Sequence, residues 1–275
     1  MGKITNEEEA LEAVRKNGTA LMRVPKNLMT MEVCRAAVKQ DALALHFVPD
    51  ELWTASPKKL GALCFEAVKQ NALALIFVPK NLITAELCLQ AVKKDGSALN
   101  NVPKNLRTAE VCRAAVKQYG WALQFVPRNL KTTSPKEFGA ISLEAVKQRG
   151  SALEYVPKNL RTMEVCRAAV KQYAMTLEYV PRSLRTASPK EFGAICLEAV
   201  KQRGSALEYV PKNLRTPELC LEAVKEVGLA IELVPENLKT AELCLEAVNS
   251  VFARVFKNVP EALRGEVRRA LKNGA

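Results

Sequence analysis

The chain has eight cysteines and one histidine, the residue types that most often supply a nucleophile or hold zinc. Ser142 and Ala10 occupy the cysteine position in two further copies of one pattern, so that position accepts only small side chains. We therefore predict buried core thiols, with no disulfide and no zinc site, since the sequence also lacks a C-x-x-C pair. The cysteines all lie four residues before the valine of an Ala-Val pair: Cys34, Cys64, Cys88, Cys112, Cys166, Cys196, Cys220 and Cys244.

The only histidine, His46, has no evident catalytic role. Other copies of the pattern hold Gln124, Glu154 or Glu208 at this position, which are ordinary choices for a solvent-facing residue. No strand pattern precedes a glycine-rich phosphate loop. We expect no enzyme activity, no cofactor and no small-molecule substrate, and an enzyme that uses one of the cysteines is the alternative that stays open.

Cations recur in columns around a proline that ends each copy, which we call the corner proline. One column directly follows this proline: Lys26, Lys80, Lys104, Arg128, Lys158, Arg182 and Lys212. A second column lies four residues after it: Arg107, Lys131, Arg161, Arg185, Arg215 and Lys239. A third follows each core valine: Lys39, Lys69, Lys93, Lys117, Lys147, Lys171, Lys201 and Lys225. With a formal net charge of +12, such columns can form ridges for an acidic protein face or a phosphate backbone.

Duplication offers a simpler explanation of these columns. Residues 108–161 and 162–215 are near copies, and copying preserves solvated charges whether or not they are useful. The alternative that the cations are only copied edges therefore stays open.

Aromatic residues form a further column two residues before the corner proline: Phe47, Phe77, Phe125, Tyr155, Tyr179 and Tyr209. Aromatics next to cations can stack on bases, and tyrosine is also frequent at protein interfaces. Half-buried packing explains the column equally well, because other copies have Arg23, Asn101 or Leu233 there. We predict that these six aromatics bind a partner together with Lys104, Arg128, Lys158, Arg182, Lys212, Arg107, Arg161, Arg185 and Arg215.

The columns exist because the chain repeats one unit about ten times. In nine copies the corner proline lies eleven residues after the valine of the Ala-Val pair, and successive prolines lie 24 or 30 residues apart. The tenth copy, Val248 to Pro260, is one residue longer. Thr108 followed by AEVCRAAVKQ predicts a capped amphipathic helix, and the segment ALEYV predicts a second helix too short to be stable alone. Proline then ends the second helix and begins one turn, PKNL.

The longer copies carry an insert that begins with Ser-Pro. Ser56, Ser134 and Ser188 precede these prolines, and Glu137 and Glu191 follow two of the serines at capping-box distance. The insert therefore predicts an extension of the first helix by more than a turn at its N-terminus.

Two more features accompany the long copies. Gly150 and Gly204 follow the Lys-Gln pair and predict the end of the helix. Arginine replaces an apolar residue in the copy before each insert, at Arg35, Arg113 and Arg167. We hypothesise that these arginines lie beside the long helices and pair with Glu137 or Glu191.

Units that bury their apolar faces only by stacking form a solenoid. We predict an all-α fold, an α-helical solenoid (superhelix) of about ten 24- or 30-residue two-helix repeats. It would form a single domain over residues 1–275, with an N-terminal repeat or cap at 1–29, stacked repeats at 30–247 and a C-terminal repeat or cap at 248–275.

The run EAVKQRGSALEYVPKNLRT resembles a family of short bacterial helical repeats of about 25 residues, catalogued as a domain of unknown function. The units of that family read like AVkqnG-aLqya-eeLr. The resemblance covers essentially the whole chain, which carries proline where the family often has Ala or Ser. It implies a helical repeat and supplies no catalytic residues. The repeat length is also similar to leucine-rich repeat variants, in which an α-helix alternates with a 3₁₀-helix.

We expect a non-enzymatic scaffold that binds a macromolecule through an extended basic surface, with an acidic face of a protein as the favoured partner. The alternative is a sequence-tolerant RNA- or DNA-binding protein that uses the Lys/Arg ridges and the aromatic column. The N-terminal MGKITNEEEALEAV has no apolar signal region, and no stretch approaches the roughly 20 apolar residues of a membrane span. A cytoplasmic location is therefore expected, and secretion without an N-terminal signal stays open.

Overall fold

The structure, a computed structural model, describes residues 4–55, 57–250 and 255–273. Within these ranges every regular element is a helix and none is a strand, which confirms the predicted all-α helical repeat array. The chain divides into two compact units, Met1–Gln148 and Arg149–Ala275. The expectation of a single domain with two caps stays a prediction.

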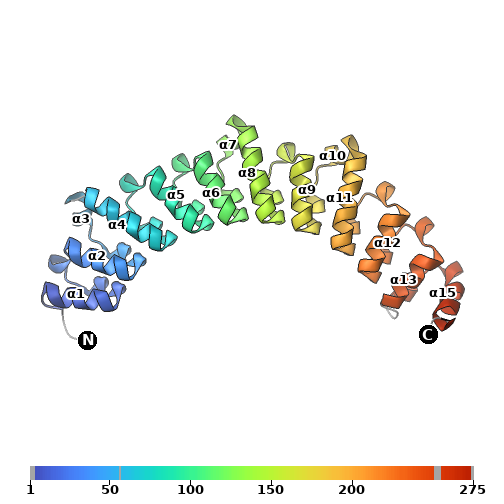
Figure 1. The fold of residues 1–275 in the computed structure, drawn as a ribbon, viewed down its shortest axis with the longest axis horizontal. Coiled ribbons are helices and arrows are strands. Elements are labelled where there is room, and N and C mark those ends of the chain that lie inside the picture. The colour runs from blue at the N-terminus through green and yellow to red at the C-terminus, as the bar shows by residue number, and fades with distance from the viewer. Residues whose placement is uncertain (1–3, 56, 251–254, 274–275) are drawn as a thin grey trace. The chain divides into compact units, whose positions relative to one another are not determined.

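In the first unit the α-helices pack against one another in chain order (Figure 1). They are α1 (Glu7–Lys16), α2 (Met31–Gln40), α3 (Asp50–Ala55), α4 (Pro57–Gln70), α5 (Ala85–Lys94), α6 (Ala109–Gln118), α7 (Arg128–Thr133) and α8 (Pro135–Gln148). Six-residue 3₁₀-helices follow them as η1 (Gly18–Arg23), η3 (Ala42–Phe47), η4 (Ala72–Phe77), η6 (Gly96–Asn101) and η8 (Gly120–Phe125). One-turn 3₁₀-helices follow the corner prolines as η2 (Lys26–Leu28), η5 (Lys80–Leu82) and η7 (Lys104–Leu106).

The second unit repeats this order. Its α-helices are α9 (Met163–Gln172), α10 (Arg182–Ala187), α11 (Pro189–Gln202), α12 (Pro217–Glu226), α13 (Ala241–Ser250) and α15 (Glu261–Asn273). Its longer 3₁₀-helices are η9 (Gly150–Tyr155), η11 (Ala174–Tyr179), η12 (Gly204–Tyr209) and η14 (Gly228–Leu233). The short ones are η10 (Lys158–Leu160), η13 (Lys212–Leu214), η15 (Glu236–Leu238) and η16 (Phe256–Asn258).

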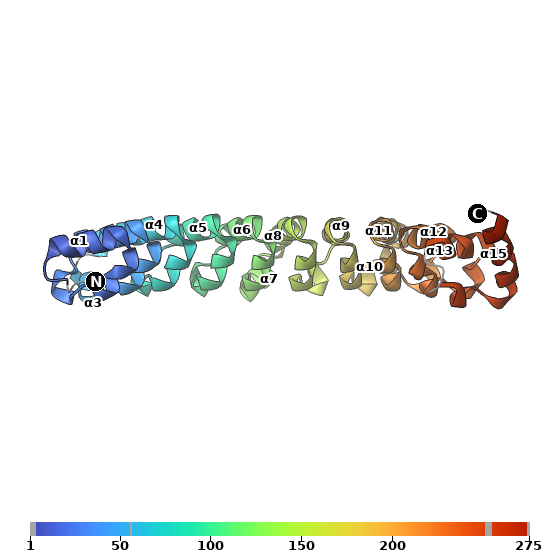
Figure 2. The same cartoon turned by 90° about the horizontal axis from the view of Figure 1, so that it is seen from below.

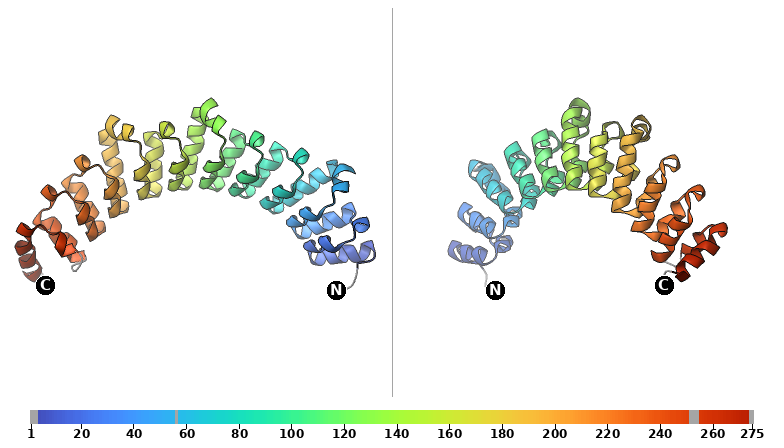
Figure 3. Two further views of the ribbon diagram at one scale, coloured as in Figure 1. Left: turned by 180° about the vertical axis from the view of Figure 1, so that it is seen from behind. Right: turned by 45° about the vertical axis from the view of Figure 1, so that its right-hand side comes forward.

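Each unit has two layers, which are clearest in Figure 2. The long α-helices form one layer. The 3₁₀-helices form the other layer together with short α-helices such as α7 in the first unit and α10 in the second. The order of the helices within each unit is the same in two further views (Figure 3). Each repeat therefore presents one α-helical edge and one 3₁₀ edge.

The α-helices begin and pack as their sequences predict. The Thr108 hydroxyl accepts a hydrogen bond from the Val111 N–H at 3.3 Å, and Thr162 caps α9 in the same way through Val165. Four residues of α6 form its buried stripe: Val111, Cys112, Ala115 and Val116. The ALEYV segments are 3₁₀-helices whose Ala and Leu side chains are buried against neighbouring repeats.

Glycine marks the end of the long helices for a reason different from the expected one. Helix α8 ends at Gln148 and α11 at Gln202, as predicted. However, no glycine among the described residues has a positive φ, so Gly150 and Gly204 are not left-handed caps. A Cβ atom on Gly150 would overlap the Ala169 carbonyl oxygen of the next repeat. Close approach of the neighbouring helix therefore explains the glycine.

The inserts are divided between two elements. The long helices α8 and α11 have 14 residues, compared with 10 in α6 and α9, so the first helix gains slightly more than one turn, as predicted. The remaining residues turn the one-turn 3₁₀-helix into a six-residue α-helix, α7 or α10. Ser188 makes no side-chain cap hydrogen bond, so the predicted capping box at α11 is wrong. Ser56 lies outside the described residues.

Candidate binding surface

The eight cysteines are all free and buried. Burial raises the pKa of the Cys64, Cys112 and Cys196 thiols to about 12. These thiols are therefore poor nucleophiles. In the part of the chain that the structure describes, no group of three or more His, Cys, Asp or Glu side chains is placed to hold a metal ion. The expected absence of enzyme activity and of cofactors stays a prediction.

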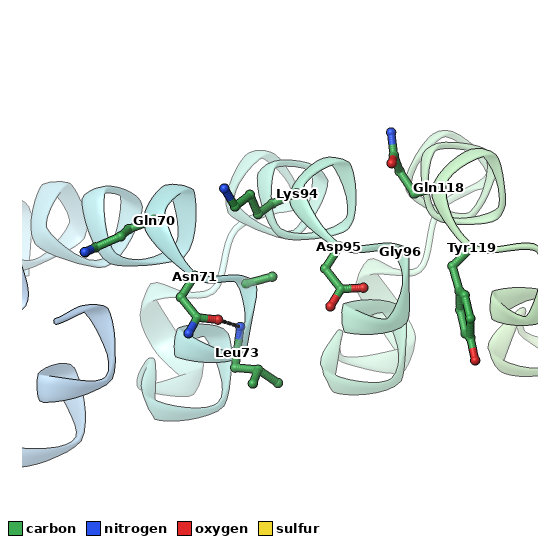
Figure 4. Close-up of a pocket in the computed structure, with 9 residues that line it drawn as sticks. Gln70, Asn71, Leu73, Lys94, Asp95, Gly96, Gln118 and Tyr119 are labelled. Carbon is green, nitrogen blue, oxygen red and sulfur yellow. Dashed lines mark hydrogen bonds between the residues drawn. The ribbon is translucent and has the colours of Figure 1, made fainter.

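A polar pocket of about 430 Å³ lies where α4, α5 and α6 end (Figure 4). Gln70, Lys94 and Gln118 come from the helix ends, and Asn71 accepts a hydrogen bond from the Leu73 N–H at 3.0 Å. Asp95 makes the equivalent contact with the Ser97 N–H at 2.8 Å. The Asn71 and Asp95 side chains thus cap 3₁₀-helices. The residues that line the pocket do not include a nucleophile paired with a base.

The aromatic column lies in the 3₁₀ layer, and all six of its side chains are half-buried. His46 contacts two of them, with its ring centroid 5.1 Å from that of Phe47 and 4.7 Å from that of Phe77. Burial and the nearby Glu154 and Glu178 carboxylates raise the pKa of Tyr179. Their half-buried state agrees with a packing role. Their role in partner binding stays a prediction.

The column four residues after the corner proline serves the backbone. We call this position the arginine slot. The Arg107 guanidinium donates to the main-chain oxygens of Val102 at 2.8 Å and Asn100 at 3.0 Å, and to Phe125 of the next repeat at 2.8 Å. Arg161 repeats the pattern with Val156 at 2.8 Å, Glu154 at 3.1 Å and Tyr179 at 2.7 Å. Arg215 does so with Val210, Glu208 and Leu233.

The corner proline explains why the oxygen three residues before it needs a donor. In a 3₁₀-helix the oxygen of residue i accepts from the N–H of residue i+3. For Asn100 that residue is Pro103, which has no N–H. The planar guanidinium provides several N–H groups in a fixed arrangement and so replaces the missing donor. Arg185 does the same at its own corner through Val180 and Glu178.

The arginine slot is therefore not a freely exposed cationic ridge. Arg107, Arg161, Arg185 and Arg215 are half-buried, and burial lowers the pKa of Arg107 and Arg161. Arg161 also lies over the Tyr179 ring, 5.7 Å from its centroid. The structure thus brings the predicted arginines and aromatics together inside the 3₁₀ layer. Whether they also bind a partner stays a prediction.

The residues after the corner proline are exposed. We call six of them the corner cations, and none forms an ion pair among the described residues: Lys80, Lys104, Arg128, Lys158, Arg182 and Lys212. Lys26 belongs to the same column but lies 3.6 Å from a Glu51 carboxylate oxygen. All of the corner cations except Lys80 belong to the predicted site, and their side chains are exposed to solvent.

The two units differ in what surrounds these cations. Three residues before the corner proline, the first unit has the neutral residues Ile76, Asn100 and Gln124, all exposed. The second unit has an exposed glutamate at the same position in each of four repeats: Glu154, Glu178, Glu208 and Glu232. The corner cations Lys80, Lys104 and Arg128 of the first unit therefore have no carboxylate at this position.

The hypothesis about the arginines that precede each insert is confirmed for their position beside a long helix, but it is wrong about their ion-pair partners. Arg35 lies 3.7 Å from a Glu66 oxygen on α4, and Arg167 lies 3.3 Å from a Glu198 oxygen on α11. Each therefore contacts a long helix, but Arg167 pairs with Glu198 and not with Glu191. Arg113 and Glu137 line one groove between α5, α6 and α8.

Sequence reasoning missed two sets of contacts between repeats. Besides the arginines, Gln148 donates to the Lys117 carbonyl oxygen at 2.7 Å, and Gln202 donates to that of Lys171 at 3.0 Å. The fixed distance of the arginines and glutamines from the corner proline was visible in the sequence. It did not reveal whether those side chains point to solvent or to a neighbouring repeat.

These features define a helical repeat protein whose corners are held by proline and arginine. Residues 6–53, 84–131 and 141–185 match the model of the family described as Domain of unknown function (DUF4116), and together they make up more than half of the chain. The chain belongs to this family. No curated protein and no solved structure matches it significantly. None of the helices in the described ranges has the length and apolar character needed to cross a bilayer.

Proposed function

We propose that this protein is a non-enzymatic helical-repeat scaffold that binds an acidic face of another protein. The observation that carries the proposal is the set of corner cations, which are exposed, form no ion pair with any residue that the structure describes and stand at the same point of their repeats. Complementary charge raises the association rate and orients the partner. The buried, protonated thiols suit a reducing cytoplasm, which we propose as the location.

Within the first unit the corner cations offer the clearest binding surface. Lys80, Lys104 and Arg128 have no acidic residue three positions before their prolines, so no carboxylate at that position competes with an incoming one. Phe77 and Phe125 lie in the same layer and supply partly exposed rings. An acidic segment with some apolar side chains fits this combination.

The test uses the full chain and short fluorescein-labelled peptides that are acidic, neutral or basic and equal in length. We expect the acidic peptide to bind most tightly. The variant Lys80→Glu/Lys104→Glu/Arg128→Glu should weaken its binding about tenfold or more. The matched control, Lys39→Glu/Lys69→Glu/Lys93→Glu, changes the net charge equally on the α-helical layer and should weaken binding much less. Equal loss in both variants, or no binding of the acidic peptide, would overturn the proposal.

RNA and DNA oligonucleotides of matched charge form the last arm of this test. If they bind more tightly than the acidic peptide, with affinity that falls steeply as salt rises, the protein is a nucleic-acid binder instead. Similar affinity for peptide and oligonucleotide would indicate binding by net charge alone and would also overturn the proposal.

A further inference from the structure

The arginine slot is not filled by arginine in every repeat. The guanidinium reaches three oxygens where the next corner proline lies 24 residues on, as it does for Arg107, Arg161 and Arg215. Two other repeats share this spacing, but Met29 and Ile83 stand in their slots. An aliphatic side chain donates no hydrogen bond. The oxygens around these two slots therefore receive nothing from the residue in the slot.

A groove of about 660 Å³ lies at the Ile83 slot. Its lining includes Ile76, Val78 and Asn101, along with Ile83 itself. These three residues stand 24 positions before Asn100, Val102 and Phe125, whose main-chain oxygens accept from Arg107. The groove thus lies where a guanidinium is held in the next repeat.

The backbone around the groove has the conformation that holds arginine elsewhere. Val78 has φ −76° and ψ 127°, and its equivalent Val102 has φ −70° and ψ 131°. The following prolines agree equally well, with φ −56° and ψ 139° at Pro79 and φ −54° and ψ 139° at Pro103. The oxygens of the two corners are therefore directed alike.

The oxygens at the groove also lack their usual donors. The N–H that would bond to the Ile76 oxygen belongs to position 79, which is proline. No main-chain N–H outside the helices reaches the Val78 oxygen among the described residues. An oxygen pair of this kind favours a donor with several N–H groups.

We propose that this groove is a receptor for an arginine side chain supplied by another protein. The guanidinium would donate to the main-chain oxygens of Ile76, Val78 and Asn101, as Arg107 does to the equivalent oxygens within its own chain. The site does not depend on the proposed binding of an acidic face, because its acceptors are backbone oxygens and not the corner cations.

The rim of the groove favours an arginine within a polypeptide. Ile76 is 55% exposed, and Leu106 lines the same groove. Their apolar surface can contact residues on either side of the incoming arginine, which a free guanidinium ion lacks. Lys80 also lines the groove. A lysine at this point does not exclude a guanidinium, since Lys104, Lys158 and Lys212 precede Arg107, Arg161 and Arg215 in the same arrangement.

The chain offers a direct probe of the groove because it has only six isoleucines: Ile4, Ile76, Ile83, Ile141, Ile195 and Ile231. Methyl NMR of the full chain labelled at isoleucine therefore reports on the site through Ile76 and Ile83, and on distant regions through Ile141, Ile195 and Ile231. The probes are short blocked peptides with a central arginine, lysine or citrulline between leucines.

We expect the arginine peptide to shift the Ile76 and Ile83 methyl signals saturably and to leave the three distant signals unchanged. The lysine and citrulline peptides should bind at least about tenfold more weakly, because the first lacks the planar fork and the second lacks the charge. An equal response to all three peptides, or no response at Ile76 and Ile83, would overturn the proposal.

The decisive variant is Ile83→Arg, which fills the slot from within the chain. It should raise the melting temperature and abolish binding of the arginine peptide. Ile83→Lys should raise the melting temperature less and should leave some peptide binding. If Ile83→Arg binds the peptide as the unmodified chain does, the groove is not an arginine slot. If the unmodified chain dimerises and Ile83→Arg prevents it, the arginine comes from a second copy and the proposed partner is wrong. Binding of the acidic peptide should be the same in both chains, which separates this test from that of the proposed function.

Discussion

The two units stabilise the same short 3₁₀-helices at opposite ends. In the first unit, side-chain oxygens of Asn17, Asp41, Asn71 and Asp95 cap the N-termini of η1, η3, η4 and η6, whereas η8 has no such cap. In the second unit, the residues at the equivalent position make no side-chain cap: Arg149, Tyr173, Arg203 and Val227. There the slot holds Arg161, Arg185, Arg215 and Arg264 at four corners, which donate to the oxygens at the corner, and Lys239 at the fifth. Either device satisfies polar groups that a short helix leaves unpaired.

This difference decides which surface each unit leaves open. In the second unit arginines donate to oxygens at four of the five corners, and Lys239 occupies the slot of the fifth. A glutamate also precedes four of its corner prolines by three residues. In the first unit Arg107 closes one corner, whereas Ile83 leaves a groove at the corner before it. In the first unit the fold therefore leaves backbone acceptors and apolar surface open at the Ile83 corner.

The largest effect should come from removing an arginine of the second unit. Arg161→Ala leaves the oxygens of Glu154, Val156 and Tyr179 without their donor, so we expect the free energy of unfolding to fall by about 2–3 kcal/mol. Urea denaturation measures the loss, and hydrogen exchange should place it in η9 and η11. Arg161→Lys should recover only a small part, since lysine lacks the planar fork. A change below about 0.5 kcal/mol, as expected for an exposed residue such as Lys158, would show that the arginines do not stabilise the second unit.

A smaller effect should follow from removing a cap of the first unit. Asn71→Ala removes the 3.0 Å hydrogen bond to the Leu73 N–H and should cost about 0.5–2 kcal/mol in urea denaturation. The converse change, Arg203→Asn, introduces a cap in the second unit at a residue with similar backbone angles, φ −155° and ψ 107°. It should increase stability by about 0.5–1 kcal/mol. If the new asparagine destabilises the chain, the two devices are not interchangeable.

The weakest contrast concerns pH, because both units bury their thiols alike. Burial raises the pKa of Cys64 in the first unit and of Cys196 in the second to about 12. The unfolded chain releases these protons first, above about pH 8.5. The stabilisation is therefore complete below that pH and is lost as pH rises toward the folded pKa. Urea midpoints at pH 7.5 and pH 10 should show this decline, and serine at either position, as at Ser142, should reduce it equally. A decline confined to one unit's cysteine would contradict equal burial.

Much of the fold was predictable from local pattern. The buried stripe of α6, its Thr108 cap and the turn after each proline all depend on residues within a few positions of one another. The exposure of the corner cations also followed, because a residue after the corner proline lies outside both packed helices. The division of the inserts between two helices, the absent Ser188 cap and the packing role of Gly150 escaped this reasoning.

The arginine slot could not be predicted in the same way. Its position in the repeat was visible, and a column of cations without nearby acidic partners suggests a solvated ridge. Its role depends on the proline removing an N–H and on an oxygen 18 residues later coming within 2.7 Å of Arg161.

By itself, then, the sequence determined the repeat length, the two helices of each unit, the small residues at the cysteine position and the corner at each proline. These are local properties of spacing and backbone geometry. The tertiary structure decided which positions are used between repeats. The arginines bond at the corners, Gly150 packs against Ala169, and a groove lies at Ile83. Hydrogen bonding and close packing depend on how neighbouring repeats approach, and that distance is not written within any one copy of the unit.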